Sequence, residues 1–259
     1  MNLYCERYPN HSSSDILFIH GNLASSRWWH PTLEQWKQGG SQGKHSLLFA
    51  DWRGCGRNPD WSGDKAFTLT DLAQDFIALL ERERLPKVNI VGHSLGGLIA
   101  LQMMIMKPER FNKALLLDPV GAQGVVFDDS MYEAFRQMAL SPDLTRTVIL
   151  STILNADRLD RKLQNDLAED GYKAVRGIGT AVLEILKTVD LRERAQQVKV
   201  PTLIAHGKDD AIIPLKDSAA LAQLMPNAQL EVLSGVGHCW NIEDPAAFTK
   251  RVKAWFEGV

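Results

Sequence analysis

The sequence predicts an α/β fold: a mostly parallel central sheet flanked by helices, with a helical cap inserted between its strands. Three observations predict it. Short apolar runs alternate with segments of helical periodicity, which is typical of right-handed crossovers between parallel strands. One of the apolar runs passes through a glycine-flanked turn directly into a long apolar helix. Residues 122–189 have helical periods and no convincing strand, which indicates an insertion.

The N-terminal part of the chain provides the first strands. Residues 3–8 fit one short strand. Residues 15–19, DILFI, are apolar on both faces, as a central parallel strand between helices must be. Residues 46–50 fit the next strand, and they end in a loop that begins DWRGCG. We therefore expect three strands within the first 50 residues.

Two helices are expected to cover these strands. Large apolar side chains at helical spacing predict that the first helix packs on the sheet, at Trp29, Leu33 and Trp36. The second helix is predicted over residues 71–84, with Thr70 as its N-cap. Its apolar residues recur on one face, and Pro86 ends the segment.

The next stretch, VNIVGHSLGGLIALQMMIM over residues 88–106, organises the rest of the chain. Residues 88–91 are a β-branched, apolar run of strand length, and a long apolar helix begins near Leu98. The residues between them, GHSLG, form a tight turn. The sequence thus predicts a strand, a sharp turn and a helix in immediate succession.

The remaining strands are expected at residues 114–117, 199–205 and 229–233, followed by an amphipathic helix at 245–256. Pro201 fits the start of its strand, where a missing N–H is tolerated. The predicted core domain comprises residues 1–121 and 190–259, and residues 122–189 form the predicted helical cap.

Ser94, in the middle of the GHSLG turn, is the candidate nucleophile. A serine on such a turn has a strained backbone that raises its hydroxyl above the sheet edge. Gly92 and Gly96 are required there, because a Cβ at either position would collide with the neighbouring strand or helix. The N–H of Leu95, at the start of the helix, then points to where an oxyanion would form.

A serine hydroxyl needs a general base, and the base needs an orienting acid. His238 follows the last strand in the glycine-rich loop GVGH, which can carry an imidazole over the sheet edge. Asp210 follows the preceding strand in the loop HGKDD. Both loops, like the serine turn, lie at the carboxyl ends of parallel strands, where open α/β sheets place their ligands.

A second oxyanion donor is expected after residues 15–19, where His20, Gly21 and Asn22 form a turn beside the serine. Gly21 allows close approach of the backbone, and the N–H of Asn22 is the candidate donor. The pair Asp51 and Arg53 ends the neighbouring strand, and we interpret it as a structural clamp on a loop.

Composition narrows the class of partner. The chain has 259 residues, 45% of them hydrophobic, and a formal net charge of -2, which gives no attraction to nucleic acid or to an anionic membrane. No apolar stretch is long enough to span a membrane, and the N-terminus lacks a signal-peptide pattern, so we expect a cytoplasmic protein. The three cysteines form no C-x-x-C pair, which favours reduced thiols over a zinc site or a disulfide framework.

These motifs together resemble the α/β-hydrolase superfamily. They are HGN at residues 20–22, DxRGxG at 51–56, GxSxG at 92–96, GxxD at 207–210 and GH at 237–238. The resemblance covers nearly the whole chain and implies a Ser-Asp-His chain order, a helical cap and hydrolysis through an acyl-enzyme without cofactor or metal. By motif position it implies Ser94 as nucleophile, His238 as base and Asp210 as acid, with Asn22 and Leu95 as oxyanion donors. The N-terminus departs from the family pattern, since it has room for one early strand rather than two.

The resemblance leaves alternatives open. Asp209 is adjacent to Asp210, and Asp118 ends a strand from which some members of the superfamily take their acid. The expected reaction is cleavage of a small carboxylic ester or thioester; a carbon–carbon bond hydrolase of ring-cleavage products and a triad-bearing ligand sensor with little turnover are the alternatives. In the cap, apolar residues could line an acyl pocket, and scattered arginines could meet a substrate carboxylate: Met131, Phe135, Met138 and Leu140; Arg136, Arg146 and Arg158. The sequence does not specify an oligomeric state.

Overall fold

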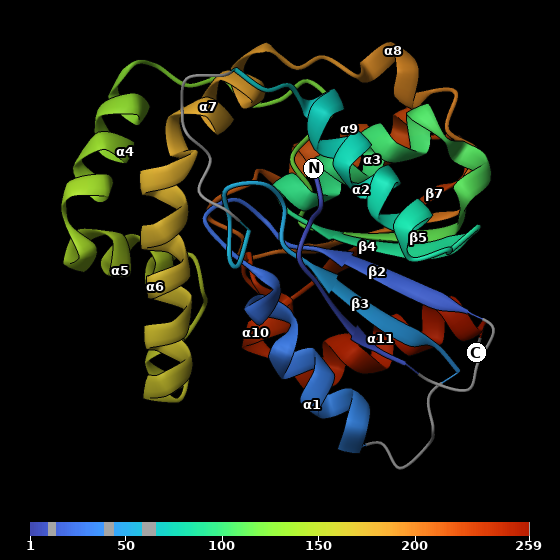
Figure 1. The fold of residues 1–259 in the computed structure, drawn as a ribbon, viewed down its shortest axis with the longest axis horizontal. Coiled ribbons are helices and arrows are strands. Elements are labelled where there is room, and N and C mark those ends of the chain that lie inside the picture. The colour runs from blue at the N-terminus through green and yellow to red at the C-terminus, as the bar shows by residue number, and fades with distance from the viewer. Residues whose placement is uncertain (10–13, 39–43, 59–65, 259) are drawn as a thin grey trace.

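The computed structural model describes residues 1–9, 14–38, 44–58 and 66–258. Its centre is a seven-stranded sheet in the order β1-β3-β2-β4-β5-β6-β7 (Figure 1). β1 pairs with β3 in antiparallel orientation, and every other pair is parallel. The strands are β1 (Cys5–Tyr8), β2 (Asp15–Ile19), β3 (Ser46–Ala50), β4 (Val88–His93), β5 (Phe111–Leu117), β6 (Thr202–Gly207) and β7 (Ala228–Leu233). The predicted fold class, with one early edge strand, is confirmed.

Helices cover both faces of this sheet. In Figure 1 α1 and α11 lie on one side of it, and α2, α3 and α9 lie on the other. The helices of these layers are α1 (His30–Gln38), α2 (Leu69–Arg82), α3 (Leu95–Met106), α9 (Leu215–Leu224) and α11 (Pro245–Glu257); α8 (Arg192–Ala195) and α10 (Trp240–Glu243) are single turns. The three-layer arrangement explains why β2, β3 and β4 are apolar on both faces, since neither face reaches water.

Each face of the sheet has its own hydrophobic core. The core beneath α1 and α11 centres on Phe18, whose ring lies 5.2 Å from that of Trp29 and 5.0 Å from that of Phe49. Trp29, Leu33 and Trp36 are all buried there, as their spacing predicts. Aromatic pairs at these separations add about 0.5–1.5 kcal/mol each to the free energy of burial, so this cluster fixes α1 on the sheet.

α3 lies in the second core and is buried along most of its length. Every residue from Leu95 to Met104 is buried, which explains why the helix is apolar on all sides instead of amphipathic. α2 beside it begins two residues earlier than its apolar periodicity predicts. Thr68, not Thr70, is its N-cap: the Thr68 hydroxyl accepts a hydrogen bond from the N–H of Asp71, and the Asp71 carboxylate accepts one from the N–H of Thr68.

Residues 122–189, here called the insertion, are all described, and none lies in a strand. The insertion contains α4 (Ser130–Leu140), α5 (Pro142–Ser151), α6 (Arg161–Gly177) and α7 (Gly179–Thr188), which stand together at one end of the sheet (Figure 1). Its two ends are tied together, because the N–H of Leu191 donates to the carbonyl of Ala122 at 2.7 Å and the N–H of Val125 donates to Leu186 at 2.9 Å.

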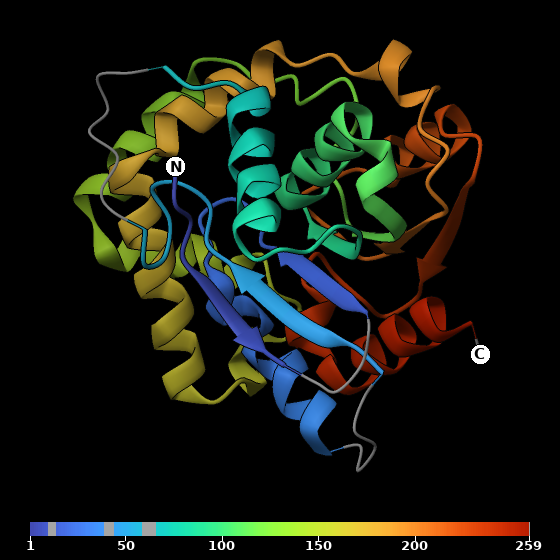
Figure 2. The ribbon, with the colours of Figure 1, turned by 45° about the vertical axis from the view of Figure 1, so that its right-hand side comes forward.

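The register of the sheet brings the ends of its central strands into line. Ile19 of β2 is paired with Gly92 of β4, Gly92 with Leu116 of β5, and Leu116 with Ile204 of β6. The loops that follow these strands therefore leave the sheet at one edge. Figure 2 shows that the arrowheads of β2 and β3 point toward the side on which the insertion stands. Among the described residues, no helix combines the length and apolarity needed to cross a bilayer.

Candidate active site

Ser94 occupies a strained turn between β4 and α3. Its φ of 54° and ψ of -119° are unusual for a residue with a Cβ. The turn is held by the N–H of Ser94, which donates to the carbonyl of Leu117 at 2.9 Å, and by the N–H of Gly97, which donates to the carbonyl of Ser94 at 2.9 Å. Because β5 supplies one of these partners, the sheet itself maintains the strain.

The glycines on either side of the turn allow two close backbone approaches. A Cβ on Gly92 would lie 2.5 Å from the carbonyl oxygen of Gly96, so α3 could not leave β4 so steeply. A Cβ on Gly96 would lie 2.3 Å from the carbonyl oxygen of Ile19. The glycines therefore place the start of α3 directly against the end of β2.

His238 and Asp210 form a hydrogen-bonded pair. The Nδ1–H of His238 donates to Oδ2 of Asp210 at 2.8 Å, which leaves Nε2 as the basic nitrogen. The other oxygen of Asp210 accepts the N–H groups of Ile212 and Ile213 at 2.7 and 3.0 Å. Burial raises the pKa of Asp210, but the hydrogen bond and charge of His238 together with these two amides bring it below its usual value. Asp210 is thus an ionised acid that fixes the imidazole tautomer.

The two rival acids lie elsewhere. The carboxylate of Asp209 accepts the N–H of Gly235 at 3.0 Å and so stabilises a neighbouring loop. Asp118 is buried, and Oδ1 of its carboxyl accepts the N–H of Gly207 at 2.8 Å. Burial, reinforced by the nearby charge of Asp210, raises the pKa of Asp118 well above its ordinary value. The environment of Asp118, behind the pair, therefore favours its neutral, protonated form.

This raised pKa predicts a pH-dependent effect of Asp118→Asn on stability. The folded state holds the proton more tightly than the unfolded state, so the stability associated with Asp118 is present below the unfolded pKa of 3.8 and is lost as pH rises above it. Asparagine does not titrate. We expect the melting temperature of the variant, relative to the wild type, to be higher near pH 7 than near pH 4. Calorimetry at the two pH values measures this difference, and an equal offset at both would contradict the raised pKa.

Asp118, His206 and Asp210 are a group of three potential metal ligands among the described residues, with ligand atoms within 4.8 Å of one another. Both oxygens of Asp210 have donors, Oδ1 of Asp118 accepts from Gly207, and Nδ1 of His206 lies 2.8 Å from the hydroxyl of Ser218. Oδ2 of Asp118 and Nε2 of His206, in contrast, have no hydrogen-bond partner among the described residues. Burial lowers the pKa of His206. We interpret the group as a buried hydrogen-bonding cluster behind the His238–Asp210 pair.

The two proposed oxyanion donors flank the serine. Asn22 and Leu95 both line the cavity that contains Ser94. Leu95 is the first residue of α3, where backbone N–H groups have no acceptor within the helix. Gly21 lies so close that a Cβ on it would be 3.1 Å from the Cβ of Ser94. The turn after β2 and the serine turn are therefore adjacent, as the motif order predicts.

His93 and Glu243 are two residues at the site that the motifs do not identify. Nε2 of His93 donates to the backbone carbonyl of His238 at 2.8 Å, which joins the serine turn to the histidine loop. Burial lowers the pKa of His93 to about 3, so it acts as a neutral donor. The carboxylate of Glu243 accepts the N–H groups of Gly237, Cys239 and Leu154. The only sequence signal that Glu243 holds the His238 loop is its position five residues after His238.

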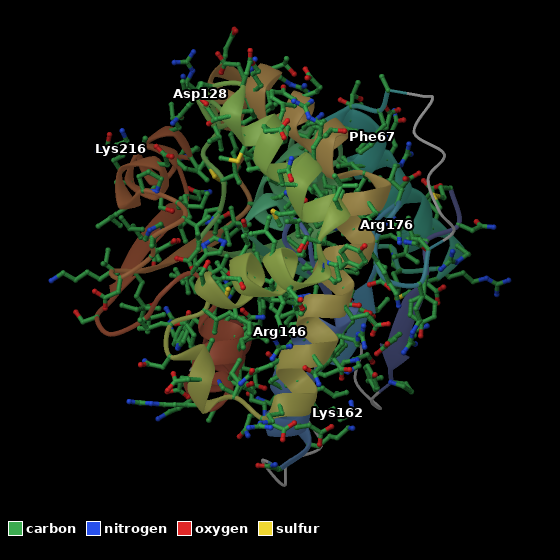
Figure 3. All side chains as sticks on the ribbon, turned by 90° about the vertical axis from the view of Figure 1, so that its left-hand side faces the viewer. Phe67, Asp128, Arg146, Lys162, Arg176 and Lys216 are labelled. Carbon is green, nitrogen blue, oxygen red and sulfur yellow. The ribbon has the colours of Figure 1, made fainter. Side chains whose placement is uncertain are left out.

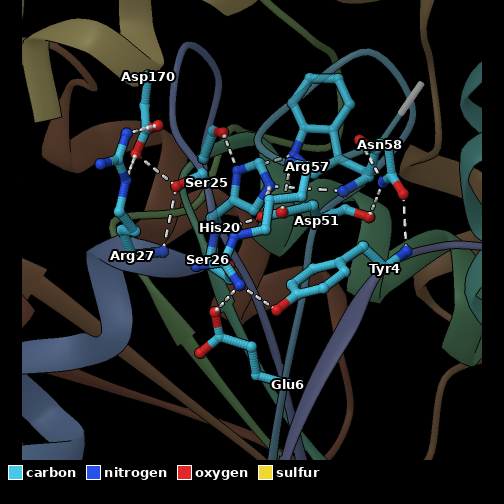
Figure 4. Close-up of polar contacts among 12 residues, drawn as sticks. Tyr4, Glu6, His20, Ser25, Ser26, Arg27, Asp51, Arg57, Asn58 and Asp170 are labelled. Atoms are coloured by element: carbon cyan, nitrogen blue, oxygen red, sulfur yellow. Dashed lines mark hydrogen bonds and ion pairs between the residues drawn. The ribbon is translucent and has the colours of Figure 1, made fainter. Parts of the chain in front are cut away.

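A polar network supports the turn after β2 from the side of the insertion (Figure 4). Asp51 is buried and accepts the N–H groups of Ser26 and Arg57, which confirms that it holds the loop, whereas Arg53 pairs with Asp75 of α2 at 2.7 Å. Arg27 pairs with the buried carboxylate of Asp170 on α6, its Nε donating at 2.8 Å. The segment that follows Asn22 is thereby attached to the insertion.

The cavity at Ser94 has a volume of about 340 Å³ and lies between the sheet edge and the insertion. Met131, Phe135 and Met138 lie on its wall, whereas Leu140 does not and is exposed. The three candidate arginines also lie outside the wall. Arg136 pairs with Glu133, and Arg146 donates to Asn165 and Gln164 on the insertion surface (Figure 3); Arg158 is likewise absent from the cavity lining.

Comparisons with known proteins agree with this fold. A family model described as the alpha/beta hydrolase fold matches residues 16–245. The chain is 28% identical over 232 residues to 3-oxoadipate enol-lactonase 2 of Acinetobacter baylyi, with 86% of this chain and 83% of the relative covered. It is 25% identical over 248 residues, 93% of each chain, to a Pseudomonas savastanoi pv. phaseolicola protein provisionally named carbamate hydrolase RutD. The crystal structure of the enol-lactonase from Burkholderia xenovorans superposes with a TM-score of 0.84 at 20% identity, covering 98% of this chain and 96% of that one.

Proposed function

This chain belongs to the alpha/beta hydrolase family and is a hydrolase, and from this premise we propose that it cleaves small carboxylic esters or thioesters through a covalent acyl-enzyme. The observation that carries the proposal is the His238–Asp210 hydrogen bond of 2.8 Å, with His238 on the wall of the same cavity as the strained Ser94. A nucleophile, a base and an acid that orients the base are the groups that acyl transfer requires.

In the proposed mechanism the hydroxyl oxygen of Ser94 attacks the acyl carbon while Nε2 of His238 takes the hydroxyl proton. The N–H groups of Asn22 and Leu95 stabilise the resulting oxyanion. The carbon–oxygen or carbon–sulfur bond then breaks, and His238 gives its proton to the departing alcohol or thiol. A water molecule, deprotonated by His238, attacks the acyl-enzyme, and the acid product leaves as Ser94 regains its proton. Asp210 stabilises the imidazolium in both halves of the reaction.

Two observations support an ester-like substrate. The cavity beside Ser94 has room for a small organic molecule, and substrate sites of enzymes are usually concave cavities of this kind. One relative is named an enol-lactonase, and the other is provisionally named a carbamate hydrolase. Lactones and carbamates both contain a carbonyl carbon that water can attack. Continued turnover of simple esters separates the proposal from the ligand sensor, which would be acylated once and stall.

The proposal is tested by labelling and turnover together. We expect a fluorophosphonate probe to add one adduct to the intact protein, located on Ser94 by peptide mass spectrometry. We also expect p-nitrophenyl acetate and butyrate to give continued release of nitrophenolate after any initial burst. One adduct with no steady turnover would contradict the proposed esterase and favour a sensor. Labelling at another residue would contradict the assignment of Ser94.

A further inference from the structure

The cavity wall indicates which esters this site accepts. We propose that the substrate is a neutral ester with an apolar acyl chain, and that esters carrying an additional ionised carboxylate on that chain are excluded. The inference rests on the proposed function, because it assumes that Ser94 attacks an ester bound in this cavity. It specifies the charge and the polarity of the substrate, which the catalytic groups alone do not determine.

The walls of the cavity are almost entirely apolar. The insertion contributes Phe135 and Met138 from α4, Ile149 from α5 and Leu183 from α7, and the core contributes Leu23 and Val120. All of these side chains are buried. Among the described residues that line the cavity, no lysine, arginine, aspartate or glutamate is present. Each methylene group of an alkyl chain that is buried here removes apolar surface from water and so stabilises binding.

Most polar groups on the wall already have partners within the protein. The side-chain oxygen of Asn22 accepts the N–H of Leu23 at 2.9 Å. The hydroxyl of Thr152 donates to the carbonyl of Ile149 at 2.7 Å, and the thiol of Cys239 contacts the carbonyl of Thr152 at 3.5 Å. Burial raises the pKa of Cys239 well above its usual value, so the thiol stays neutral. The hydroxyl and the thiol therefore have no hydrogen left to donate to an anion.

Two fully buried side-chain nitrogens on the wall lack partners among the described residues: Nε1 of Trp28 and Nδ1 of His93. The Trp28 indole can only donate, and it offers one N–H. Nδ1 of His93 can only accept, because this neutral imidazole already uses its proton to donate to the carbonyl of His238. One donor suits a single neutral oxygen, whereas a carboxylate has two oxygens that each need donors.

The charged groups around the His238 loop and the turn after β2 also oppose an anion. Asp210 is ionised behind His238, and Glu243 holds the loop that carries His238. Arg27, which could offset them, is bound to acidic side chains of α6: Asp166, Glu169 and Asp170. An anionic chain end in the cavity would therefore be desolvated without a counter-ion and close to charges of its own sign.

The test compares three p-nitrophenyl esters whose acyl chains each contain six carbon atoms. p-Nitrophenyl hexanoate has a methyl chain end, mono-p-nitrophenyl adipate has a carboxylate there, and p-nitrophenyl methyl adipate has a neutral methyl ester. We expect kcat/KM for the adipate monoester to be lower than for hexanoate by at least about a hundredfold, with the methyl adipate much closer to hexanoate. Equal kcat/KM for the charged and neutral esters would overturn the inference. A methyl adipate as poor as the monoester would also overturn it, since size and not charge would then be responsible.

A charge introduced on the wall provides a second measurement. Met131 lies on the cavity wall and is 37% exposed, so an arginine at this position can keep its guanidinium hydrated. We expect Met131→Arg to narrow the hexanoate-to-adipate ratio by about tenfold or more, and Met131→Leu to leave the ratio unchanged. An unchanged ratio in Met131→Arg would count against a charge-based exclusion. Failure of the proposed function is distinguishable, because none of the three esters would then be turned over continuously, whether or not fluorophosphonate labels Ser94.

Discussion

Replacement of Ser94 by alanine is expected to reduce kcat for p-nitrophenyl butyrate by about a millionfold, to the level of the uncatalysed reaction aided by binding alone. The variant removes the only atom that forms the acyl-enzyme in the proposed mechanism. It leaves the backbone strain unchanged, because alanine and serine both carry a Cβ at the φ of 54° that this position requires. The loss should therefore reflect chemistry and not misfolding.

The measurement is steady-state release of nitrophenolate by the purified variant, with fluorophosphonate labelling of the same sample. Far-ultraviolet circular dichroism and the melting temperature serve as controls for folding. We expect both to match the wild type, since the Ser94 turn is held by backbone hydrogen bonds that alanine keeps. Substantial residual turnover by a well-folded variant would show that another nucleophile performs the reaction.

Replacement of Asp210 by asparagine is expected to lower kcat by about ten-thousandfold, the size of effect seen when other serine triads lose their acid. An amide oxygen can still accept the N–H groups of Ile212 and Ile213, so the loop should keep its shape. The amide loses the charge that stabilises the imidazolium, and its N–H₂ group favours the wrong tautomer of His238. The measurement is kcat for butyrate across the neutral pH range.

Asp118→Asn is the matched control for Asp210→Asn. The raised pKa of Asp118 favours its neutral form, so its replacement by a neutral amide should change kcat by less than about tenfold. The two substitutions are chemically identical and lie in the same buried cluster. If Asp118→Asn were the inactive variant and Asp210→Asn the active one, the acid of the triad would be Asp118.

The sequence predicted the bounds of β2 and β3 correctly, but it missed the starts of β5 and β6 by three residues and the start of α2 by two. β2 and β3 were located residue by residue, because a strand buried on both faces needs an uninterrupted apolar run. The start of α2 was wrong by two residues, because Thr68 and Thr70 are both good N-caps. The choice depends on the reciprocal hydrogen bonds between Thr68 and Asp71, which only Thr68 can make.

At the site, too, features with a local sequence pattern were predictable and contacts between distant residues were not. The loops that carry Ser94, Asp210 and His238 were predictable, because parallel strands direct their carboxyl ends to one edge. The contact between His93 and the backbone of His238 joins residues 145 apart in the chain and has no local pattern. The cavity wall could be predicted only in part, since Met138 and Leu140 are both apolar in the sequence, but α4 turns one inward and the other outward.

The hydrogen bond between Ala122 and Leu191 has a consequence for how such a chain can diversify. The insertion leaves the sheet and returns to it at two residues that touch, so its replacement by a segment of another length would leave the strands on either side where they are. Selection could then alter substrate preference through one continuous stretch of coding sequence while the reacting groups stay encoded outside it. A transplanted segment would need to bring a partner for Arg27, because Asp170 would depart with the original one.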